Sequence, residues 1–592
     1  MKKLLVKTKT SVVIGVVFLT VAGLVAAVAV TGSLPSNLFL AVNRPTIINV
    51  SKVADTDDGG CNRDCSLREA VKQANLDVSG RTIIIRIPAG NYLINEPLEI
   101  ENTSTEIVLS GHSSEDTIIQ GQSGIFTNLE IKEAVQAKIN GLTIKGALYG
   151  IVARTNSRFI INDSEIRENT NGLVSELNEL EVNRTIITEN TQEGFMNSGS
   201  AIIRSSSITT NGTYGISCIP DSSDFIFEPT LNIINSDINF NGQDGILAQC
   251  DVTMINSRLN NNGYSGIYFV NGSLRINNSE IKENSGTGLF FMAGDMMVAD
   301  ALIEGNHFTT NQHSFIAQAL GGGGVFVSSG QAVISDSAII NNISETNGGG
   351  VYSYGGNLTI ISSTVESNSA VDFGGAIYSK SGSVVVDKSL IADNNSAFAA
   401  AVYNNHAFDL NNSTVYNNEN TDLNEAVGNG IIYNDSAGTS YIFQSTISNN
   451  ILGRGKSYGL YTIGNDINLK SSIIASHSIT VRGIVSSLNC FGGFMSFDYN
   501  VSDDTTCDLN NSHDISNSST VGLLALADNG GPTETLALAS FSVAADLIPV
   551  ASCNDFFGVP IAEDQRGRLR PDGNFCDAGA YEHRFTIQLF PQ

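Results

Sequence analysis

Apolar residues recur at every second position along most of the chain, in segments that are only a few residues long. The stretches "LRINNSEI" (274–281) and "AVISDSAII" (332–340) are typical. Alternation with a period of two predicts short β-strands that bury one face. Gly and Asn separate the segments, and no apolar stripe with helical spacing appears among them, so the pattern predicts short strands joined by tight turns.

A phrase repeats along the chain: a small polar pair, an aliphatic residue, two variable residues and then Asn. Successive copies lie 21, 21, 30, 21, 22, 22, 36, 26, 26, 24 and 32 residues apart. A unit of 21 to 26 residues with occasional longer intervals is typical of a solenoid. The copies end at Asn169, Asn190, Asn211, Asn241, Asn262, Asn284, Asn306, Asn342, Asn368, Asn394, Asn418 and Asn450.

The content of one unit predicts a parallel β-helix. Three short strands with their turns fill about 22 residues, which is one coil, and the L-x-x-L-x-L-x-x-N phrase of leucine-rich repeats is missing. Asn tolerates the left-handed conformation that the turns need, and the recurrent Asn is expected to stack coil upon coil in a hydrogen-bonded ladder. Residues 81–521 would form roughly eighteen coils of about 4.8 Å each, about 85 Å in length. The longer intervals predict loops on one face near 218–229, 307–324 and 419–430.

One stretch near the start differs from this pattern, "GGCNRDCSLREAVKQAN" (59–75). Ser66-Leu67-Arg68-Glu69 has the pattern of a capping box, in which the Ser and Glu side chains satisfy backbone donors. Leu67, Ala70, Val71 and Ala74 then follow the i, i+3, i+4, i+7 spacing of a one-sided helix. Because the open end of a solenoid needs a cap, we predict a short amphipathic helix over the N-terminal mouth.

Both ends of the chain resemble known segments. "CSLREAVKQAN" resembles the CSLREA N-terminal segment of exported bacterial β-helix proteins. "LADNGGPTETLAL" (526–538) with "EDQRGRLRPDGNFCDAGAYE" (563–582) is similar to the choice-of-anchor Q domain. The resemblance implies export and an all-β fold, a right-handed parallel β-helix of the pectin-lyase-like kind, and it implies no activity. A weaker likeness, to the repeats of polymorphic outer-membrane proteins, which are adhesins, rests on "GGAI" at 374–377.

The first forty residues have the composition of a targeting segment. Four Lys precede an apolar run, 12–30, that is long enough to span a bilayer, and Ala27-Val28-Ala29 supplies a cleavage pattern. We therefore expect a signal peptide or an N-terminal membrane anchor in 1–43, and a secreted, cell-surface or periplasmic remainder. That remainder divides into an N-terminal cap at 44–80, a β-helix at 81–521 and a C-terminal cap at 522–592.

The eight cysteines fall into four pairs that are local in sequence. No pair lies beside a second pair with His at ligand spacing, so disulfides are favoured over metal binding. A disulfide would then close the C-terminal cap. The pairs are Cys61 with Cys65, Cys218 with Cys250, Cys490 with Cys507, and Cys553 with Cys576.

The formal charge of −27, from 32 basic and 59 acidic residues, argues against nucleic acid as a partner. It suits a soluble surface or one that collects divalent cations. Asp55, Asp57 and Asp58 resemble part of a calcium loop, but no bidentate Glu follows at position twelve, which favours a plain acidic turn. We expect that no cofactor is required, with calcium as the one candidate.

An aliphatic residue followed by an aromatic one comes after each Gly-rich turn, in register with the coils. Because neighbours in a strand point to opposite faces, either the aliphatic or the aromatic column faces outward. An outward aromatic stripe would suit contact with a receptor or glycan. An internal stack, or a stripe that the long loops cover, is favoured because exposed aromatic columns lower solubility. The aromatic residues are Tyr268, Phe290, Phe326, Tyr352, Tyr378, Tyr403, Tyr433 and Tyr461.

Parallel β-helices include pectate lyases, polygalacturonases, epimerases and glycosidases, but none of their motif sets occurs here, and no catalytic residue can be assigned. Two functions follow. The preferred one is an exported, monomeric rod that acts without catalysis as an adhesin-like protein, binding a polysaccharide or a host or matrix ligand. It would touch the membrane only through its N-terminal segment. The alternative is a polysaccharide lyase, hydrolase or epimerase with a groove beside the long loops.

Overall fold

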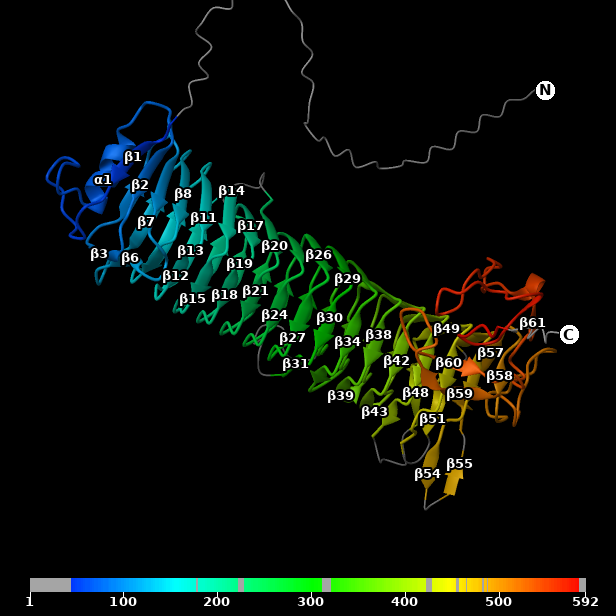
Figure 1. Cartoon of the computed structure of the whole chain (residues 1–592). Coiled ribbons are helices and arrows are strands. Elements are labelled where there is room, and N and C mark those ends of the chain that lie inside the picture. The colour runs from blue at the N-terminus through cyan, green and yellow to red at the C-terminus, as the bar shows by residue number, and fades with distance from the viewer. Residues whose placement is uncertain are drawn as a thin grey trace, which may run out of the picture. The chain divides into compact units, whose positions relative to one another are not determined.

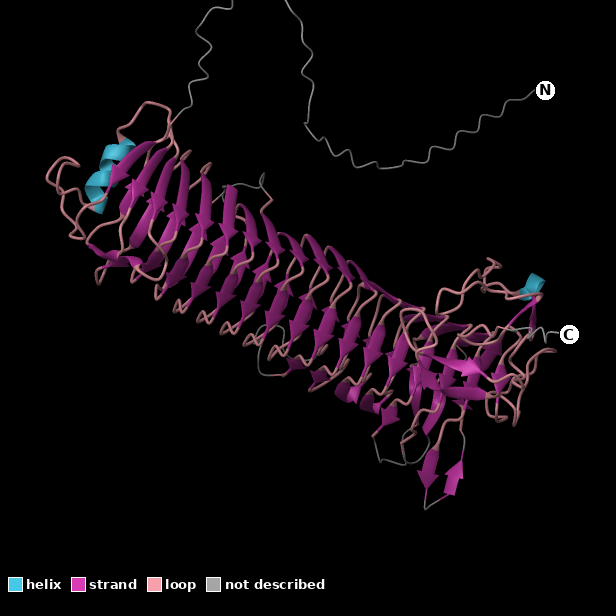
Figure 2. Ribbon diagram, viewed as in Figure 1, coloured by secondary structure: helices cyan, strands magenta, loops and turns pink. Residues whose placement is uncertain are grey.

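The structure is a computed structural model that describes residues 44–176, 179–221, 228–310, 321–421, 428–453, 457–464, 466–481, 484–486 and 488–584, without the side chains of 479–487. Pro45–Gln592 forms one compact unit. This unit is a right-handed parallel β-helix with three long sheets, as predicted (Figures 1 and 2). The predicted signal peptide or anchor at 1–43 lies outside the described residues. Within the described ones, no helix has the length and apolar character needed to cross a membrane.

Each coil contributes one strand to each of three sheets, which we call A, B and C in the order in which the chain enters them. Sheet A has 18 strands, in line with the roughly eighteen coils expected, although its first strand precedes residue 81. Its strands are β1 (Thr46–Asn49), β2 (Ile83–Arg86), β5 (Ile107–Ser110), β8 (Gln136–Asn140), β11 (Arg158–Asn162), β14 (Glu179–Asn183), β17 (Ser200–Arg204), β20 (Thr230–Ile234), β23 (Asp251–Ile255), β26 (Ser273–Asn277), β29 (Asp295–Ala299), β33 (Gln331–Ser335), β37 (Asn357–Ile361), β41 (Ser383–Asp387), β45 (Ala407–Asn411), β49 (Thr439–Phe443), β52 (Ile467–Lys470) and β57 (Phe494–Ser496).

Sheet B follows a tight turn after each strand of sheet A, and most of its strands are three residues long. They are β3 (Gly90–Ile94), β6 (Thr117–Gly121), β9 (Thr143–Lys145), β12 (Glu165–Arg167), β15 (Ile186–Thr188), β18 (Ser207–Thr209), β21 (Asp237–Asn239), β24 (Arg258–Asn260), β27 (Glu280–Lys282), β30 (Leu302–Glu304), β34 (Ala338–Ile340), β38 (Thr364–Glu366), β42 (Leu390–Ala392), β46 (Thr414–Tyr416), β50 (Thr446–Ser448), β53 (Ile473–Ala475) and β58 (Val501–Ser502).

Sheet C has 16 strands and carries the aromatic residues singled out above. Its strands are β4 (Leu98–Ile100), β7 (Thr127–Ile131), β10 (Tyr149–Ala153), β13 (Asn171–Ser175), β16 (Phe195–Asn197), β19 (Ile216–Cys218), β22 (Ile246–Ala248), β25 (Ile267–Phe269), β28 (Leu289–Phe291), β32 (Val325–Val327), β36 (Val351–Ser353), β40 (Ile377–Ser379), β44 (Val402–Asn404), β48 (Asn429–Asn434), β51 (Ser457–Thr462) and β56 (Cys490–Phe491).

A fourth sheet, D, which the repeat did not predict, appears where the interval lengthens after Asn306. The extra residues of these coils form short parallel strands between sheets B and C. They are β31 (His307–Phe308), β35 (Ile343–Ser344), β39 (Ser369–Phe373), β43 (Asn395–Phe398) and β47 (Glu419–Asn420), and the central parts of the predicted loops lie outside the described residues.

The predicted Asn ladder is confirmed. The side chain of Asn190 donates to Asn211 Oδ1 at 2.9 Å, and its backbone N–H donates to the same oxygen at 3.3 Å. The same pattern links the recurrent Asn residues from Asn169 to Asn450, all of them buried. Asn residues such as Asn235 and Asn256 have positive φ in the turns, as predicted, but the Asn residues of the ladder do not. The residue before each one has positive φ, such as Thr210 at 58°, which leaves the Asn amide free to point into the stack.

The N-terminal helix forms as predicted. Helix α1 (Leu67–Asn75) has Ser66 as its N-cap and a complete capping box with Glu69. Its predicted apolar face is buried and packs against β1, β2 and β4. Burial alone would raise the pKa of Glu69, but hydrogen bonds from the Ser66 and Asp58 backbone lower it. The first strand, β1, comes from within the segment assigned to the cap and pairs with β2.

All four predicted disulfides are present, and no cysteine is free. Cys218 and Cys250 join adjacent coils, with their Cα atoms 6.0 Å apart. The four bridges and the β-helix fit an exported protein. Cys553 and Cys576 lie in the C-terminal region, where they close the predicted cap.

The C-terminal region does more than close the end of the solenoid, because it folds back along the outer face of sheet B (Figure 1). There, outward side chains such as Ile473 and Val501 join Ile548 and Ala578 in a second apolar core. The region contains β59 (Leu523–Ala527), β60 (Thr535–Leu538), β61 (Ile548–Pro549), a 3-10 helix (Val550–Ser552) and β62 (Phe575–Cys576), and the antiparallel pair β54 (Ile479–Val481) and β55 (Ile484–Ser486) extends from a late coil.

Candidate functional site

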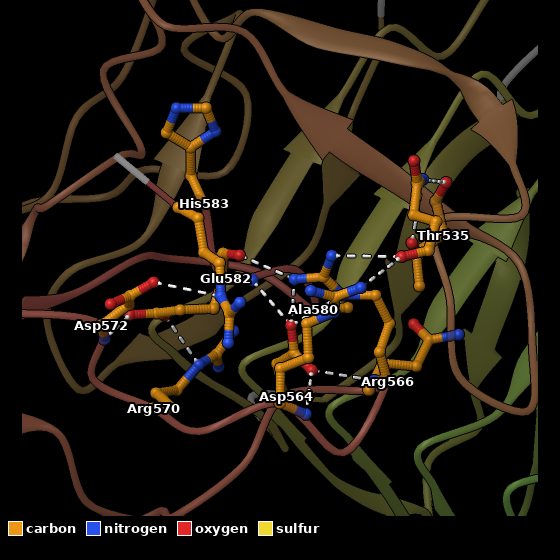
Figure 3. Close-up of polar contacts among 12 residues, drawn as sticks. Thr535, Asp564, Arg566, Arg570, Asp572, Ala580, Glu582 and His583 are labelled. Carbon is orange, nitrogen blue, oxygen red and sulfur yellow. Dashed lines mark hydrogen bonds and ion pairs between the residues drawn. The ribbon is translucent and has the colours of Figure 1, made fainter. Parts of the chain in front are cut away.

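A buried polar network fastens the C-terminal region to the solenoid (Figure 3). Arg566 pairs with Asp564 at 2.5 Å and Arg570 pairs with Glu582 at 3.0 Å, and all four side chains are at most 3% exposed. Arg570 also donates to Gln444 of the solenoid. Burial raises the pKa of Glu582 to about 7, against the lowering effect of the Arg570 charge, and the network joins two parts of the fold. We assign it a structural role.

The outer face of sheet C differs from the rest of the surface because most of its strands carry no charged side chain. Within the described part of the chain, its strands from β10 to β56 contain no Asp, Glu, Lys or Arg. In most of these strands the flanking residues point into the core and the middle one points outward. Ile267 and Phe269, for example, are completely buried, whereas Tyr268 between them is partly exposed. Outward positions hold aromatic, aliphatic or hydroxyl side chains.

The eight aromatic residues stack in one outward column, as their register predicts. Ring centroids of successive members lie 4.5 to 5.5 Å apart. Phe491, in β56, extends the column beyond Tyr461 at 4.9 Å. Most neighbouring rings are nearly parallel, but Tyr352 stands edge-on to both of its neighbours, at 89° and 88°.

The middle of the column is covered. Phe290, Phe326 and Tyr352 are at most 2% exposed and form a separate apolar cluster with Phe308 of sheet D. The Gly-rich turns lie close above them: a Cβ on Gly348 would come within 2.9 Å of the Tyr352 Cβ, and the φ of Gly348 is +62°. A covered stripe was one of the favoured alternatives, and the structure shows it for this part of the column.

The other five members, Tyr268, Tyr378, Tyr403, Tyr433 and Tyr461, are half-buried. Tyr433 is within 8° and 11° of parallel with its two neighbours, so its faces are occupied by other rings. A sugar that stacks on an aromatic residue needs a free face. This part of the column therefore offers ring edges and phenol hydroxyls to a ligand.

Those hydroxyls remain protonated at neutral pH. Burial, followed by the nearby Asp435 carboxylate, raises the pKa of Tyr433 to about 12. Burial and Asp435 also raise the pKa of Tyr403, whose hydroxyl donates to Asp435 Oδ2 at 2.9 Å. The same carboxylate, after burial, raises the pKa of Tyr378. The column thus presents hydroxyl donors in a row, at the spacing of about 4.8 Å between neighbouring coils.

Two carboxyl groups border the N-terminal part of this face, within a set that we call the carboxyl–tyrosine cluster: Glu193, Tyr214, Asp244, Tyr264 and Tyr268. The first three each precede the Gly that leads into a strand of sheet C. The N–H of the Gly after Glu193 donates to the Tyr214 carbonyl at 3.0 Å, and the N–H of the Gly after Tyr214 donates to the Asp244 carbonyl at 3.2 Å. Glu193, Tyr214 and Asp244 therefore stand in one column on three successive coils.

Burial raises the pKa of both carboxyl groups. Burial raises the pKa of Asp244 to about 7, although the Ser265 backbone N–H donates to it at 2.7 Å. Burial also raises the pKa of Glu193 against a hydrogen bond from Ser217. Burial raises the pKa of Tyr214, and the charges of Asp244 and Glu193 raise it further, so its hydroxyl lies near both carboxyl groups.

Inspection of the sequence does not reveal this column, because its two acids are 51 residues apart and belong to no known motif. A usable signal is present in the tripeptides "EGF" (193–195), "YGI" (214–216) and "DGI" (244–246). Alignment of the coils on that Gly places Glu193 and Asp244 in the same position. A search for acidic residues that lie next to each other in the sequence would miss Glu193 and Asp244.

The three acids of the suggested calcium loop do not converge. Asp55 accepts two hydrogen bonds from Arg68, both at 2.8 Å, and Asp57 pairs with Lys72. Within the described residues, no group of three or more His, Cys, Asp or Glu is placed to hold a metal ion. Two of the predicted ligands thus attach the cap to its helix, and calcium at Asp55, Asp57 and Asp58 stays a prediction.

Residues 225–365 match the family of right handed beta helix regions. Three solved structures are similar to the chain. They are the Dettilon tailspike protein gp208 (12% identity, TM-score 0.28, 68% of this chain and 66% of that one), a mutant of the PL6 family alginate lyase AlyGC (12%, 0.27, 77% and 85%) and pectate lyase Pel9A (13%, 0.18, 92% and 98%). No curated protein is significantly similar in sequence.

Proposed function

We propose that the protein is an exported, adhesin-like rod that binds a neutral polysaccharide along the outer face of sheet C. The observation that carries the proposal is the absence of charged residues from the described strands β10 to β56 of that sheet, in a protein with a net charge of −27. A face of this kind repels neither a neutral chain nor its hydroxyl groups. An anionic chain would meet an acidic protein without the cations that it needs.

The tyrosine hydroxyls supply the specific contacts. Tyr378, Tyr403, Tyr433 and Tyr461 present their edges at a regular spacing, and their hydroxyls can donate to or accept from sugar hydroxyls. Asp435 provides a strong acceptor within this row. An extended chain that follows the axis of the rod would meet one such edge on every coil.

The proposal also includes export of the protein and its attachment to the membrane. The disulfides suit an oxidising compartment, segment 1–43 acts as a signal peptide or anchor, and the CSLREA-like and choice-of-anchor Q-like segments belong to proteins of that kind. We propose a monomer that contacts the membrane only through its N-terminal segment. No calcium is needed for binding, because Asp55 and Asp57 are already paired with Arg68 and Lys72.

Binding is tested with the full-length protein on an array of neutral and acidic polysaccharides. The expected result is retention of at least one neutral chain, unaffected by high salt or by a chelator. Replacement of Tyr378, Tyr433 and Tyr461 by Phe removes three hydroxyls and keeps the ring stack. We expect an affinity weaker by about tenfold or more, since each lost hydrogen bond contributes roughly 0.5–1.5 kcal/mol, with an unchanged melting temperature.

The matched control is Tyr441→Phe, which removes a tyrosine hydroxyl from the outer face of sheet A, where the residue is 36% exposed. It should leave binding unchanged. Failure to bind any neutral polysaccharide, or equal loss in the control and the triple variant, would contradict the proposal.

A further inference from the structure

We propose that Asp244 and Glu193 are the general acid and general base of a glycoside-hydrolysing site that acts on the polysaccharide held by sheet C, with Tyr214 between them as a positioning residue. The inference rests on the proposed function, because it takes the chain bound along that face as its substrate. It adds hydrolysis of the bound chain to the proposed binding function.

The solenoid sets the separation of the two backbone positions that carry the carboxyl groups. Glu193 and Asp244 hold the same position two coils apart, so their backbones are separated by about 9.6 Å at a coil rise of about 4.8 Å. Inverting glycosidases separate their two carboxyl groups by about 6.5–9.5 Å, whereas retaining enzymes need about 5–5.5 Å. A separation of one coil would suit a retaining enzyme. The separation of two coils found here lies close to that of an inverting enzyme, which holds a water molecule between its carboxyl groups.

The surroundings of the two carboxyl groups favour a different role for each of them. Asp244 is only 4% exposed and receives one backbone hydrogen bond, and the raised pKa keeps it partly protonated near neutral pH, as a general acid requires. Glu193 is less buried and bonded to the Ser217 hydroxyl, which suits a carboxylate base. Burial and then the charges of Asp244 and Glu193 raise the pKa of Tyr214, whose hydroxyl can orient the water between the two groups.

Unused hydroxyl groups support a ligand at this position. Within the described residues, Thr213 Oγ1 and Thr287 Oγ1 are buried and have no hydrogen-bond partner. Thr213 adjoins Tyr214, and Thr287 stands in the column of Asp244 two coils further on, where it is 1% exposed. Buried polar groups normally find partners, and sugar hydroxyls or an ordered water would supply them.

The charge of the cluster favours a neutral sugar. No Lys or Arg in the described chain contributes to the pKa shift of either Glu193 or Asp244. An anionic sugar would therefore meet two carboxyl groups without a cationic side chain to offset them. The side chains of the site suit a neutral chain, in line with the proposed substrate.

The proposed hydrolysis takes place in a single inverting step. Asp244 gives its proton to the glycosidic oxygen while the bond from the anomeric carbon to that oxygen breaks. A water molecule attacks the anomeric carbon from the opposite face, and Glu193 takes its proton. One water is consumed, the anomeric configuration inverts, and exchange with solvent returns the proton to Asp244.

The test uses the full-length protein with each polysaccharide that it binds. New reducing ends are measured first, and proton NMR of the earliest product then gives its anomeric configuration. The wild type should release inverted product, with activity falling above pH of about 7 as Asp244 loses its proton. Asp244→Asn and Glu193→Gln should each lower kcat by about 10²–10⁴-fold, with unchanged affinity for the chain.

Tyr214→Phe keeps the ring and should lower kcat more than it changes KM. Asp237→Asn, an exposed acid on sheet B, is the matched control and should retain full activity. Binding without release of reducing ends, retained configuration in the product, or full activity in Asp244→Asn would overturn the inference while leaving the binding proposal intact. Absence of any binding would instead remove the proposed function on which the inference rests.

Discussion

The outer faces of sheets B and C lie on the same coils and carry opposite chemistry. Sheet B carries ion pairs that cross from coil to coil, such as Arg258 with Asp237 at 2.6 Å and Lys282 with Glu304 at 3.4 Å. Sheet C, from β10 to β56, carries none of these residue types in the described chain. The interior positions of both sheets are alike, with buried Ile and Val.

The difference shows which positions the fold controls. A coil needs apolar residues inside and Asn in the turn, because neighbouring coils bury these side chains. Outward positions face solvent, where the fold makes few demands. In sheet B the outward positions carry charged side chains that keep the surface soluble. Toward the C-terminal end of the sheet, the outward positions pack against the C-terminal region. In sheet C the outward positions form an uncharged strip, which we propose as the binding face.

The largest effect is expected where sheet B is covered. Arg570→Met removes the cation from the buried pair with Glu582, which leaves that carboxyl group with backbone donors only and should destabilise the C-terminal region by about 3–5 kcal/mol. Urea unfolding followed by limited proteolysis would measure the loss. Arg584→Met, which breaks an exposed pair with Asp572, is the control; equal effects of the two variants would refute a structural role for the network.

The covered part of the sheet C column should behave as core. Tyr352→Ser empties a position that is 1% exposed, and we expect a loss of about 3 kcal/mol in the free energy of unfolding. The same change at Tyr461, near the end of the column, should lose about half as much. A melting temperature for Tyr352→Ser that equals that of the wild type would show that the column is open along its whole length.

Stability should depend on pH through Asp244, which borders sheet C. The folded state holds the Asp244 proton up to pH of about 7, whereas the unfolded state releases it near 3.8, so the stability from this group is lost as pH rises between those values. Asp244→Asn should remove that fall, which is on the order of a few kcal/mol. Chemical unfolding at several pH values across that window would measure it, and Asp237→Asn should keep the wild-type profile.

The smallest effect is expected for the exposed ion pairs of sheet B. Arg258→Ala should change the free energy of unfolding by about 0–1 kcal/mol, because exposed pairs gain little in water. Binding of polysaccharide should be unchanged. A clear loss of binding in this variant would move the ligand surface to sheet B and end the contrast between the two faces.

Much of the fold could be predicted from local patterns. The period of the Asn phrase is a property of consecutive residues, and it predicted the coils and the ladder. The spacing of Ser66 and Glu69 predicted the helix cap in the same way, because both partners lie within one turn. The cysteine pairs also lay close in sequence, so that few pairings were reasonable.

The candidate site could be predicted only in part. The register of the aromatic residues showed that they stack, but not that Phe308 and the Gly-rich turns cover the middle of the stack. The pairing of Glu193 with Asp244 depends on two intervals of unequal length, 21 and 30 residues. A loop within one coil changes the sequence distance and leaves the spatial distance the same.

The sequence by itself therefore determined the coil, its ladder, its cap and its disulfides, since each depends on residues at short and regular separations. Only the tertiary structure decided which outer face is covered, which tyrosines stay accessible and which carboxyl groups are buried. Those properties depend on the strands of sheet D, which belong to neighbouring coils, and on the C-terminal region, which returns from far along the chain. Burial is set by what packs over a side chain, and no local pattern records that.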